Sequence, residues 1–155
     1  MKITRISHIA IATDSLNEMK SVFGNLLGLP VVQEARFESG TELAMYDAGN
    51  LQIEVMHNPS PASVPGRFVH DNGPGYFHIC LEVEHLGKAL EELAAKGVRI
   101  LDSGIQKGAG GGAVTFLDPT STGGLLIELS QAPDTENDDL ACTRERRIPE
   151  STNDQ

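Results

Sequence analysis

The feature that most constrains the fold is an internal repeat, because the chain twice runs through the same order of elements. A strand-like "HIAIAT" (8–13) precedes a helical pattern in 14–29, and a strand-like "HICLEV" (78–83) precedes a second one in 85–98. In both helical patterns apolar residues recur every three or four positions, and a glycine follows the last turn. Both copies begin with a histidine eight residues before the first leucine of the helix, so the two copies are in the same register.

Three strand-like segments complete each copy. After the first helix come "GLPVVQEARF", "TELAMYDAG" and "LQIEVM", and after the second come "VRILDSGIQ", "GAVTFLD" and "LLIELS". The last strand of each copy carries a glutamate between apolar residues, Glu54 and Glu128. The sequence therefore predicts an α+β fold of two paired βαβββ modules, about 4–57 and 75–131, which form a curved mixed sheet within a single domain over 1–133.

Length and composition limit the class of protein. The chain has 155 residues and a net charge of −10, and residues 134–155 form an acidic, polar tail without periodicity that we predict to be disordered. Such an acidic balance does not suit nucleic-acid phosphates, so we expect no nucleic-acid partner. No apolar stretch approaches the roughly 20 residues of a membrane span, and no signal-peptide pattern opens the chain. We therefore expect a cytoplasmic protein without a membrane partner, whose Cys80 and Cys142 fit neither a disulfide framework nor a zinc-ligand spacing.

Four residues are unusual in strands that are otherwise apolar: His8, Glu54, His78 and Glu128. A buried histidine must satisfy two ring nitrogens, and a buried carboxylate is costly unless it is paired. If a pseudo-twofold axis relates the two modules, all four side chains converge in one cavity. Two imidazoles and two carboxylates favour a divalent transition ion (Mn, Co, Ni, Fe or Zn) with positions left for substrate oxygens, over a closed structural zinc site.

The order His, Glu, His, Glu over this repeat resembles the vicinal oxygen chelate superfamily, which includes glyoxalase I, bleomycin-resistance proteins and extradiol dioxygenases. The resemblance covers about 4–131. The segments "ISHIAIA", "QIEVMHNPSP", "KGVRILD" and "FLDPTSTGGLLIELSQ" are most similar to the methylmalonyl-CoA epimerases of that superfamily. The resemblance implies a glyoxalase-like fold, a homodimer, and the four residues above as ligands of one metal ion.

The same resemblance implies a metal-dependent epimerase, an isomerase that moves a proton at the carbon alpha to a carbonyl. An acyl-CoA thioester, methylmalonyl-CoA, is the leading small-molecule substrate. Glu128 would be both a metal ligand and an acid–base group, and Glu42 in "GTELAMY" is the candidate for the second acid–base group.

Three alternatives to this activity stay open. One is a glyoxalase I-type lactoylglutathione lyase, and another is an epimerase of the same superfamily that acts on a sugar-like or other ketone. The third is a resistance protein that binds its ligand without a metal. The segments "YFH" and "DPT" and the pair Phe23–Gly24 depart from the epimerase pattern and bear on the choice of substrate.

A glycine-rich segment, "GAGGGA" (108–113), fits the spacing of a dinucleotide-binding fingerprint. It precedes a strand instead of opening a helix after one, which is the wrong context for that motif. We expect it to form a flexible turn over the active site.

Overall fold

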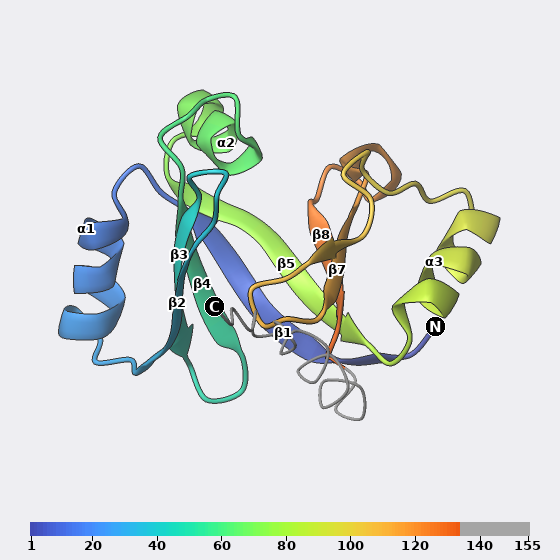
Figure 1. The fold of residues 1–155 in the computed structure, drawn as a ribbon, viewed down its shortest axis with the longest axis horizontal. Coiled ribbons are helices and arrows are strands. Elements are labelled where there is room, and N and C mark those ends of the chain that lie inside the picture. The colour runs from blue at the N-terminus through green and yellow to red at the C-terminus, as the bar shows by residue number, and fades with distance from the viewer. Residues whose placement is uncertain (134–155) are drawn as a thin grey trace, which may run out of the picture.

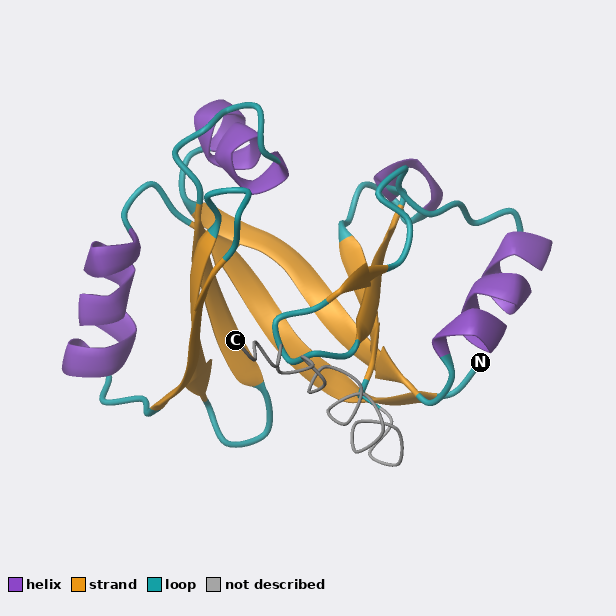
Figure 2. Ribbon diagram, viewed as in Figure 1, coloured by secondary structure: helices purple, strands orange, loops and turns teal. Residues whose placement is uncertain are grey.

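The computed structural model describes residues 1–133 as one curved sheet with helices on its outside (Figures 1 and 2). In chain order the elements are β1 (Ile3–Ala12), α1 (Leu16–Lys20), the π-helical η1 (Ser21–Leu26), β2 (Val31–Arg36), β3 (Glu42–Asp47), β4 (Gln52–His57), α2 (Val64–Asn72), β5 (Gly75–Val83), α3 (Leu86–Ala95), β6 (Gln106–Lys107), β7 (Ala113–Leu117), the 3-10 helix η2 (Pro119–Ser121) and β8 (Ile127–Gln131). The tail predicted to be disordered, 134–155, lies outside the described residues.

The sheet brings the first strands of the two modules together at its centre. Its strand order is β2-β3-β4-β1-β5-β8-β7-β6. The central strands β1 and β5 are antiparallel, and each is parallel to the last strand of its own module, β4 or β8. Because the same arrangement recurs on both sides of the β1–β5 pair, the two modules are related by a pseudo-twofold axis, which confirms the predicted α+β fold.

The strands have an apolar outer face and a more polar inner face, because successive side chains point to opposite sides of a sheet. On β4, Val55 packs in a cluster with α1, while Glu54 points inward. On β8, Leu129 packs in a cluster with α3, while Glu128 points inward. Each buried Val or Leu contributes about 1.5–3 kcal/mol, so the flanking apolar residues hold the glutamates in the strands.

The predicted helix signals are present in the structure. Ser15 is the N-cap of α1, and its hydroxyl accepts a hydrogen bond of 3.3 Å from the Glu18 backbone N–H. Gly28 and Gly97 follow the two predicted helices with φ angles of +68° and +80°, which only glycine adopts readily. None of the helices within residues 1–133 is long and apolar enough to cross a membrane.

Two parts of the chain differ from the predicted pattern. Helix α2, capped by Ser63, connects β4 to β5, although this stretch shows no strong apolar periodicity in the sequence. The segment "VRILDSGIQ", predicted as a strand, contributes only a bridge between Ile100 and Leu117 and the start of the short β6. A turn at Gly104, with a φ angle of +64°, interrupts it.

Candidate metal centre

Two histidines and two glutamates converge on the inner face of the sheet, and they are the predicted ligands His8, Glu54, His78 and Glu128. In the sheet, Ala10 of β1 pairs with Glu54 of β4 on one side and with His78 of β5 on the other. In the same way, Cys80 of β5 pairs with His8 of β1 and with Glu128 of β8. The pseudo-twofold axis therefore places one His–Glu pair from each module at a common centre.

The donor atoms of these four residues lie close together, and those of His8, Glu54 and His78 all lie within 4.8 Å of one another. The Nε2 atoms of His8 and His78 are 3.2 Å apart, and His78 Nε2 lies 2.8 Å from a Glu128 carboxylate oxygen. His8 Nε2 lies 3.5 Å from a carboxylate oxygen of each glutamate, and His78 Nε2 lies 3.7 Å from Glu54. Two nitrogens about 2.1 Å from one ion are roughly 3.0–3.4 Å apart in octahedral to tetrahedral geometry. The distance between the two Nε2 atoms therefore fits a divalent transition ion that would lie between them. Without an ion, one of these two nitrogens must carry a proton if they are to form a hydrogen bond.

Burial and pairing shift the pKa values of these groups in opposite directions. Burial raises the pKa of Glu54, and the nearby histidines oppose this effect only in part. Burial also acts to raise the pKa of Glu128, but hydrogen bonds from His78 and His8 outweigh it and lower this pKa to about 2. Burial acts to lower the pKa of His8, but contacts with Cys80 and the two carboxylates outweigh it and raise this pKa to about 10. In the absence of an ion, a proton on His8 therefore supplies the positive charge that the carboxylates require.

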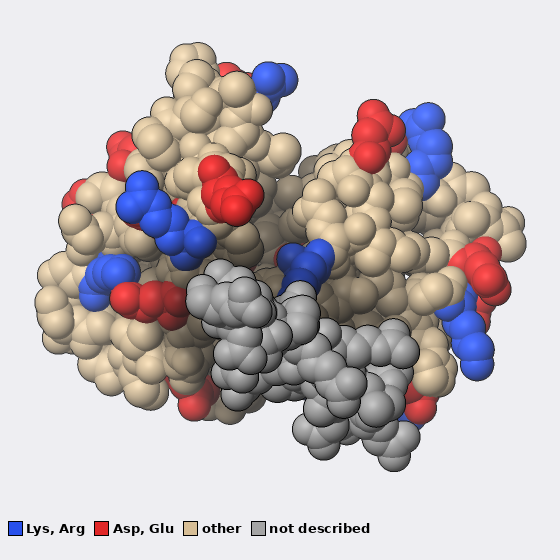
Figure 3. Space-filling view, in the orientation of Figure 1, with Lys and Arg blue, Asp and Glu red and all other residues tan. Residues whose placement is uncertain are grey.

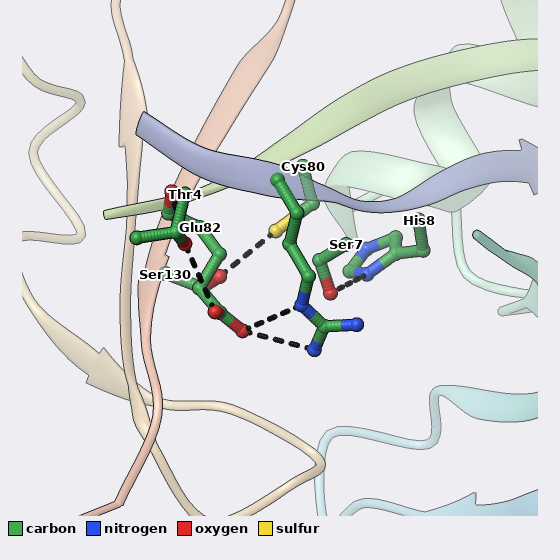
Figure 4. Close-up of polar contacts among 7 residues, drawn as sticks. Thr4, Ser7, His8, Cys80, Glu82 and Ser130 are labelled. Atoms are coloured by element: carbon green, nitrogen blue, oxygen red, sulfur yellow. Dashed lines mark hydrogen bonds and ion pairs between the residues drawn. The ribbon is translucent and has the colours of Figure 1, made fainter. Parts of the chain in front are cut away.

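The two histidine rings are held in different ways. Ser7 Oγ lies 3.4 Å from His8 Nδ1 and is drawn toward it in Figure 4. This contact leaves His8 Nε2 free to face the centre, as is usual for a histidine that binds a metal. His78 Nδ1 is buried and has no hydrogen-bonding partner within residues 1–133. Edge-on contacts with Phe77 and Phe116, both at 5.2 Å between ring centroids, fix the His78 ring instead.

The centre opens into two cavities between the modules, where the molecule is hollowed in Figure 3. We call the first, of about 280 Å³, the polar chamber, and its lining includes Arg5, Ser7, Gln33, Gln52, Cys80 and Ser130. We call the second, of about 450 Å³, the apolar chamber, and its lining includes Phe37, Leu43, Met56, Phe77, Phe116 and Leu126. Because Glu54 and Glu128 line both chambers, the proposed ligands lie where the chambers meet.

The glycine-rich segment lies over this junction. Gly108 and Ala109 line both chambers, and Gln33 of β2 donates a hydrogen bond of 2.7 Å to the Ala109 carbonyl. At Gly112, an added Cβ would lie 2.1 Å from the Gln131 backbone oxygen of β8, so only glycine fits. The segment that we expected over the active site is therefore located there and links the second module to the first.

Glu42, the remaining predicted site residue, does not reach the centre. Met45 pairs with Glu54 across β3 and β4, so Met45 and Leu43 face inward and Glu42 faces the outer side. There Glu42 forms an ion pair of 3.2 Å with Arg36. The sequence "TELAMY" could not reveal this register, because both of its faces carry apolar residues and a slip of one position would look equally good.

The polar chamber is also lined by residues that were not assigned to the site from the sequence, among them Ser7, Gln33 and Cys80. A signal for Cys80 was present, because it follows His78 by two positions in a strand and must share its face. The contacts of Ser7 and Gln33 depend on the folded sheet and had no such signal.

Comparisons with known proteins agree with this fold. Residues 7–116 match the model of the Glyoxalase/Bleomycin resistance protein/Dioxygenase superfamily. The chain is 34% identical over 130 residues to mitochondrial methylmalonyl-CoA epimerase of Homo sapiens, covering 83% of this chain and 74% of that protein. It is 35% identical over 132 residues to ethylmalonyl-CoA/methylmalonyl-CoA epimerase of Cereibacter sphaeroides, covering 83% of this chain and 98% of the relative.

Solved structures give the same result. Methylmalonyl-CoA epimerase from Mycobacterium tuberculosis superimposes with a TM-score of 0.80 and 26% identity, over 90% of this chain and 93% of that one. A methylmalonyl-CoA epimerase in complex with methylmalonyl-CoA and NH4+ superimposes with a TM-score of 0.78 and 27% identity, over 85% and 96%. By sequence and by fold, the chain therefore belongs to the glyoxalase/bleomycin resistance protein/dioxygenase superfamily, where the relatives that it resembles are methylmalonyl-CoA epimerases.

Proposed function

We propose that this protein is a metal-dependent methylmalonyl-CoA epimerase. The observation that carries the proposal is the convergence of His8, Glu54, His78 and Glu128 at the junction of two cavities, in a chain whose relatives are epimerases. A neighbouring structure of the same fold, with 26% sequence identity, is an epimerase in complex with 2-nitronate-propionyl-CoA, which supports an acyl-CoA thioester as the substrate. We also propose that the protein acts as a homodimer in the cytoplasm, as expected from its family resemblance and its sequence.

A divalent ion (Co, Mn, Ni, Zn or Fe) held by these four residues would act as a Lewis acid for the enolate oxygen of the thioester. The histidines provide neutral nitrogens, and Ser7 keeps the His8 ring oriented. The carboxylates offset the charge of a cation in a site where each of them is at most 7% exposed. The apolar chamber, with a volume of about 450 Å³, offers space for the acyl group beside the centre.

Glu128 is the acid–base group that we assign to one face of the substrate. With a pKa of about 2 it is ionised at neutral pH, and it faces both chambers. Coordination to a cation would also make Glu128 a weak base. We therefore expect the Glu128 carboxylate to act on the proton of C2 only when its coordination loosens.

Glu54 is the group that we assign to the opposite face, in place of Glu42. The described residues that line the two chambers include three carboxylates, those of Glu54, Glu82 and Glu128. Arg5 engages Glu82 in an ion pair of 2.9 Å, which leaves Glu54 as the second carboxylate of the centre. The pseudo-twofold axis relates Glu54 to Glu128, which suits a reaction that removes a proton from one face and returns it to the other.

Deuterium uptake at C2 of methylmalonyl-CoA in D₂O, followed by mass spectrometry on cobalt-loaded protein, tests this proposal. We expect rapid exchange that is lost in Glu128→Gln. Glu54→Gln should still exchange the proton of one epimer but invert it slowly, whereas a water molecule as the second proton carrier would leave inversion intact. Glu42→Gln, on the outer face, is the matched control and should keep full activity.

Protein that holds its ion but exchanges no deuterium would refute methylmalonyl-CoA as the substrate. The glyoxalase I-type hemithioacetal and other ketones would then be tested with the same preparation. A normal rate in Glu128→Gln would refute the role of Glu128 for any of these substrates.

A further inference from the structure

Cys80 places a thiol directly beside two of the proposed metal ligands. In the sheet it lies between His8 of β1 and Glu128 of β8, and it pairs with both. One donor atom from each of these three residues lies within 4.8 Å of the others, so the group can hold an ion. The Cys80 side chain is fully buried at the inner end of the polar chamber.

The two modules differ at this position. The equivalent of Cys80 in the first module is Ala10, which pairs in the same way with Glu54 and His78. Both side chains are completely buried. The two positions therefore differ in the sulfur atom of Cys80 and not in their exposure to solvent. Of these two equivalent positions, the one on the Glu128 side therefore carries a thiol and the one on the Glu54 side carries a methyl group.

A contact with Ser130 orients the thiol. Cys80 Sγ donates a hydrogen bond of 3.3 Å to Ser130 Oγ on the neighbouring strand β8 (Figure 4). Both residues line the polar chamber together with His8 and Glu128. The thiol therefore faces the chamber that leads to the centre, and the apolar core lies on the other side of the sheet.

We propose that the Cys80 thiolate is a further ligand of the metal ion, which makes the centre a mixed nitrogen, oxygen and sulfur site. As the sulfur–metal bond forms, the Sγ proton leaves to solvent, and no oxidant or reductant is needed. A thiolate favours softer ions, so Cys80 selects Co²⁺ and Zn²⁺ over Mn²⁺. This inference rests on the metal centre of the proposed function and is independent of the substrate.

Cobalt binding followed by absorption tests this ligand without any activity measurement. The wild-type protein should develop a sulfur-to-cobalt charge-transfer band in the near ultraviolet as Co²⁺ is added. Cys80→Ser and Cys80→Ala should lose the band, while Cys142→Ser, at the other cysteine of the chain, should keep it. In competition with a chelator, Cys80→Ala should lower Zn²⁺ affinity by about tenfold or more and leave Mn²⁺ affinity within about threefold.

Two results would overturn the inference and identify which part failed. A wild-type protein that binds one Co²⁺ by calorimetry but shows no such band removes Cys80 from the centre and leaves the other four ligands in place. A protein that binds no Co²⁺ removes both the thiolate ligand and the proposed metal centre. Because the band is sought in the wild-type protein, neither result depends on how well the variants fold.

Discussion

Metal binding should displace a proton from His8, and the structure gives the size of the effect. With a pKa raised from 6.5 to about 10, His8 carries its proton in almost every metal-free molecule at pH 7. Removing that proton at a pH three units below the pKa costs about 4 kcal/mol. The observed metal affinity should therefore rise about tenfold per pH unit between pH 7 and 9, since a ligand nitrogen must be free of its proton.

Isothermal titration calorimetry measures this linkage directly. Mn²⁺, whose affinity should depend little on the Cys80 thiol, is titrated into the wild-type protein at pH 7 and 8 in buffers that differ in ionisation enthalpy, because the contact with Cys80 is one cause of the raised His8 pKa. The dependence of the heat on the buffer should show the release of about one proton or more per ion. In parallel, the ring ¹⁵N chemical shifts of His8 should remain those of an imidazolium up to about pH 9 in the metal-free protein.

A metal affinity that is flat from pH 7 to 9 would refute this reasoning. A His8 ring that is already neutral at pH 8 in the metal-free protein would do the same. Either result would mean that a proton on His8 does not supply the positive charge that offsets the carboxylates of the centre.

Three further predictions concern stability and the glycine-rich segment. Because the pKa of His8 is raised, its protonated ring contributes stability to the metal-free fold. This contribution is complete below pH 6.5 and is lost as pH rises toward about 10. Because the pKa of Glu128 is lowered, its ionised carboxylate contributes stability that is complete above pH 4.5 and is lost as pH falls toward about 2. The Tm of the metal-free protein in a calorimetric scan should therefore be highest between pH 4.5 and 6.5. Gly112→Ala forces a Cβ to 2.1 Å from a backbone oxygen and should displace the segment and reduce epimerase activity, whereas Gly110→Ala, with no atom within 4 Å, should match the wild type. Leu129→Ala removes a side chain that is 1% exposed and should cost about 2–5 kcal/mol in urea denaturation; a loss below about 1 kcal/mol would contradict its place in the core.

The sequence was informative about the centre because the strand period leaves little freedom. In "QIEVM" and "LLIELS" the apolar neighbours must face the helices, so Glu54 and Glu128 must face the opposite side. The two histidines follow from the matching register of the repeats. Together these patterns predicted four residues that the structure brings within hydrogen-bonding or ion-pair distance.

Other features depend on contacts that no local pattern encodes. The face of Glu42 is decided by the pairing of β3 with β4, since both faces of β3 are apolar. Helix α2 forms where Phe68 can pack against Phe77 of β5, with 5.1 Å between the centroids of the two rings. This contact joins two different elements, so no local sequence pattern encodes it. The glycine-rich segment is linked to the first module by the hydrogen bond from Gln33 to the Ala109 carbonyl, which joins residues 76 positions apart.

The pairing of the two modules would itself be a condition for the proposed metal binding. Each module alone contributes one histidine and one glutamate, which are too few donors to hold a transition ion tightly. The antiparallel pairing of β1 with β5 supplies the second pair, and it places His8 of one module opposite Cys80 of the other. An ion that binds only when the two modules are paired would shift the equilibrium toward the paired state. The free energy of metal binding would therefore also stabilise the pairing of β1 with β5. In the proposed site, a module that would bind an ion only weakly by itself is paired with a second copy, so the ion would stabilise the centre of the fold and would meet different groups on its two sides.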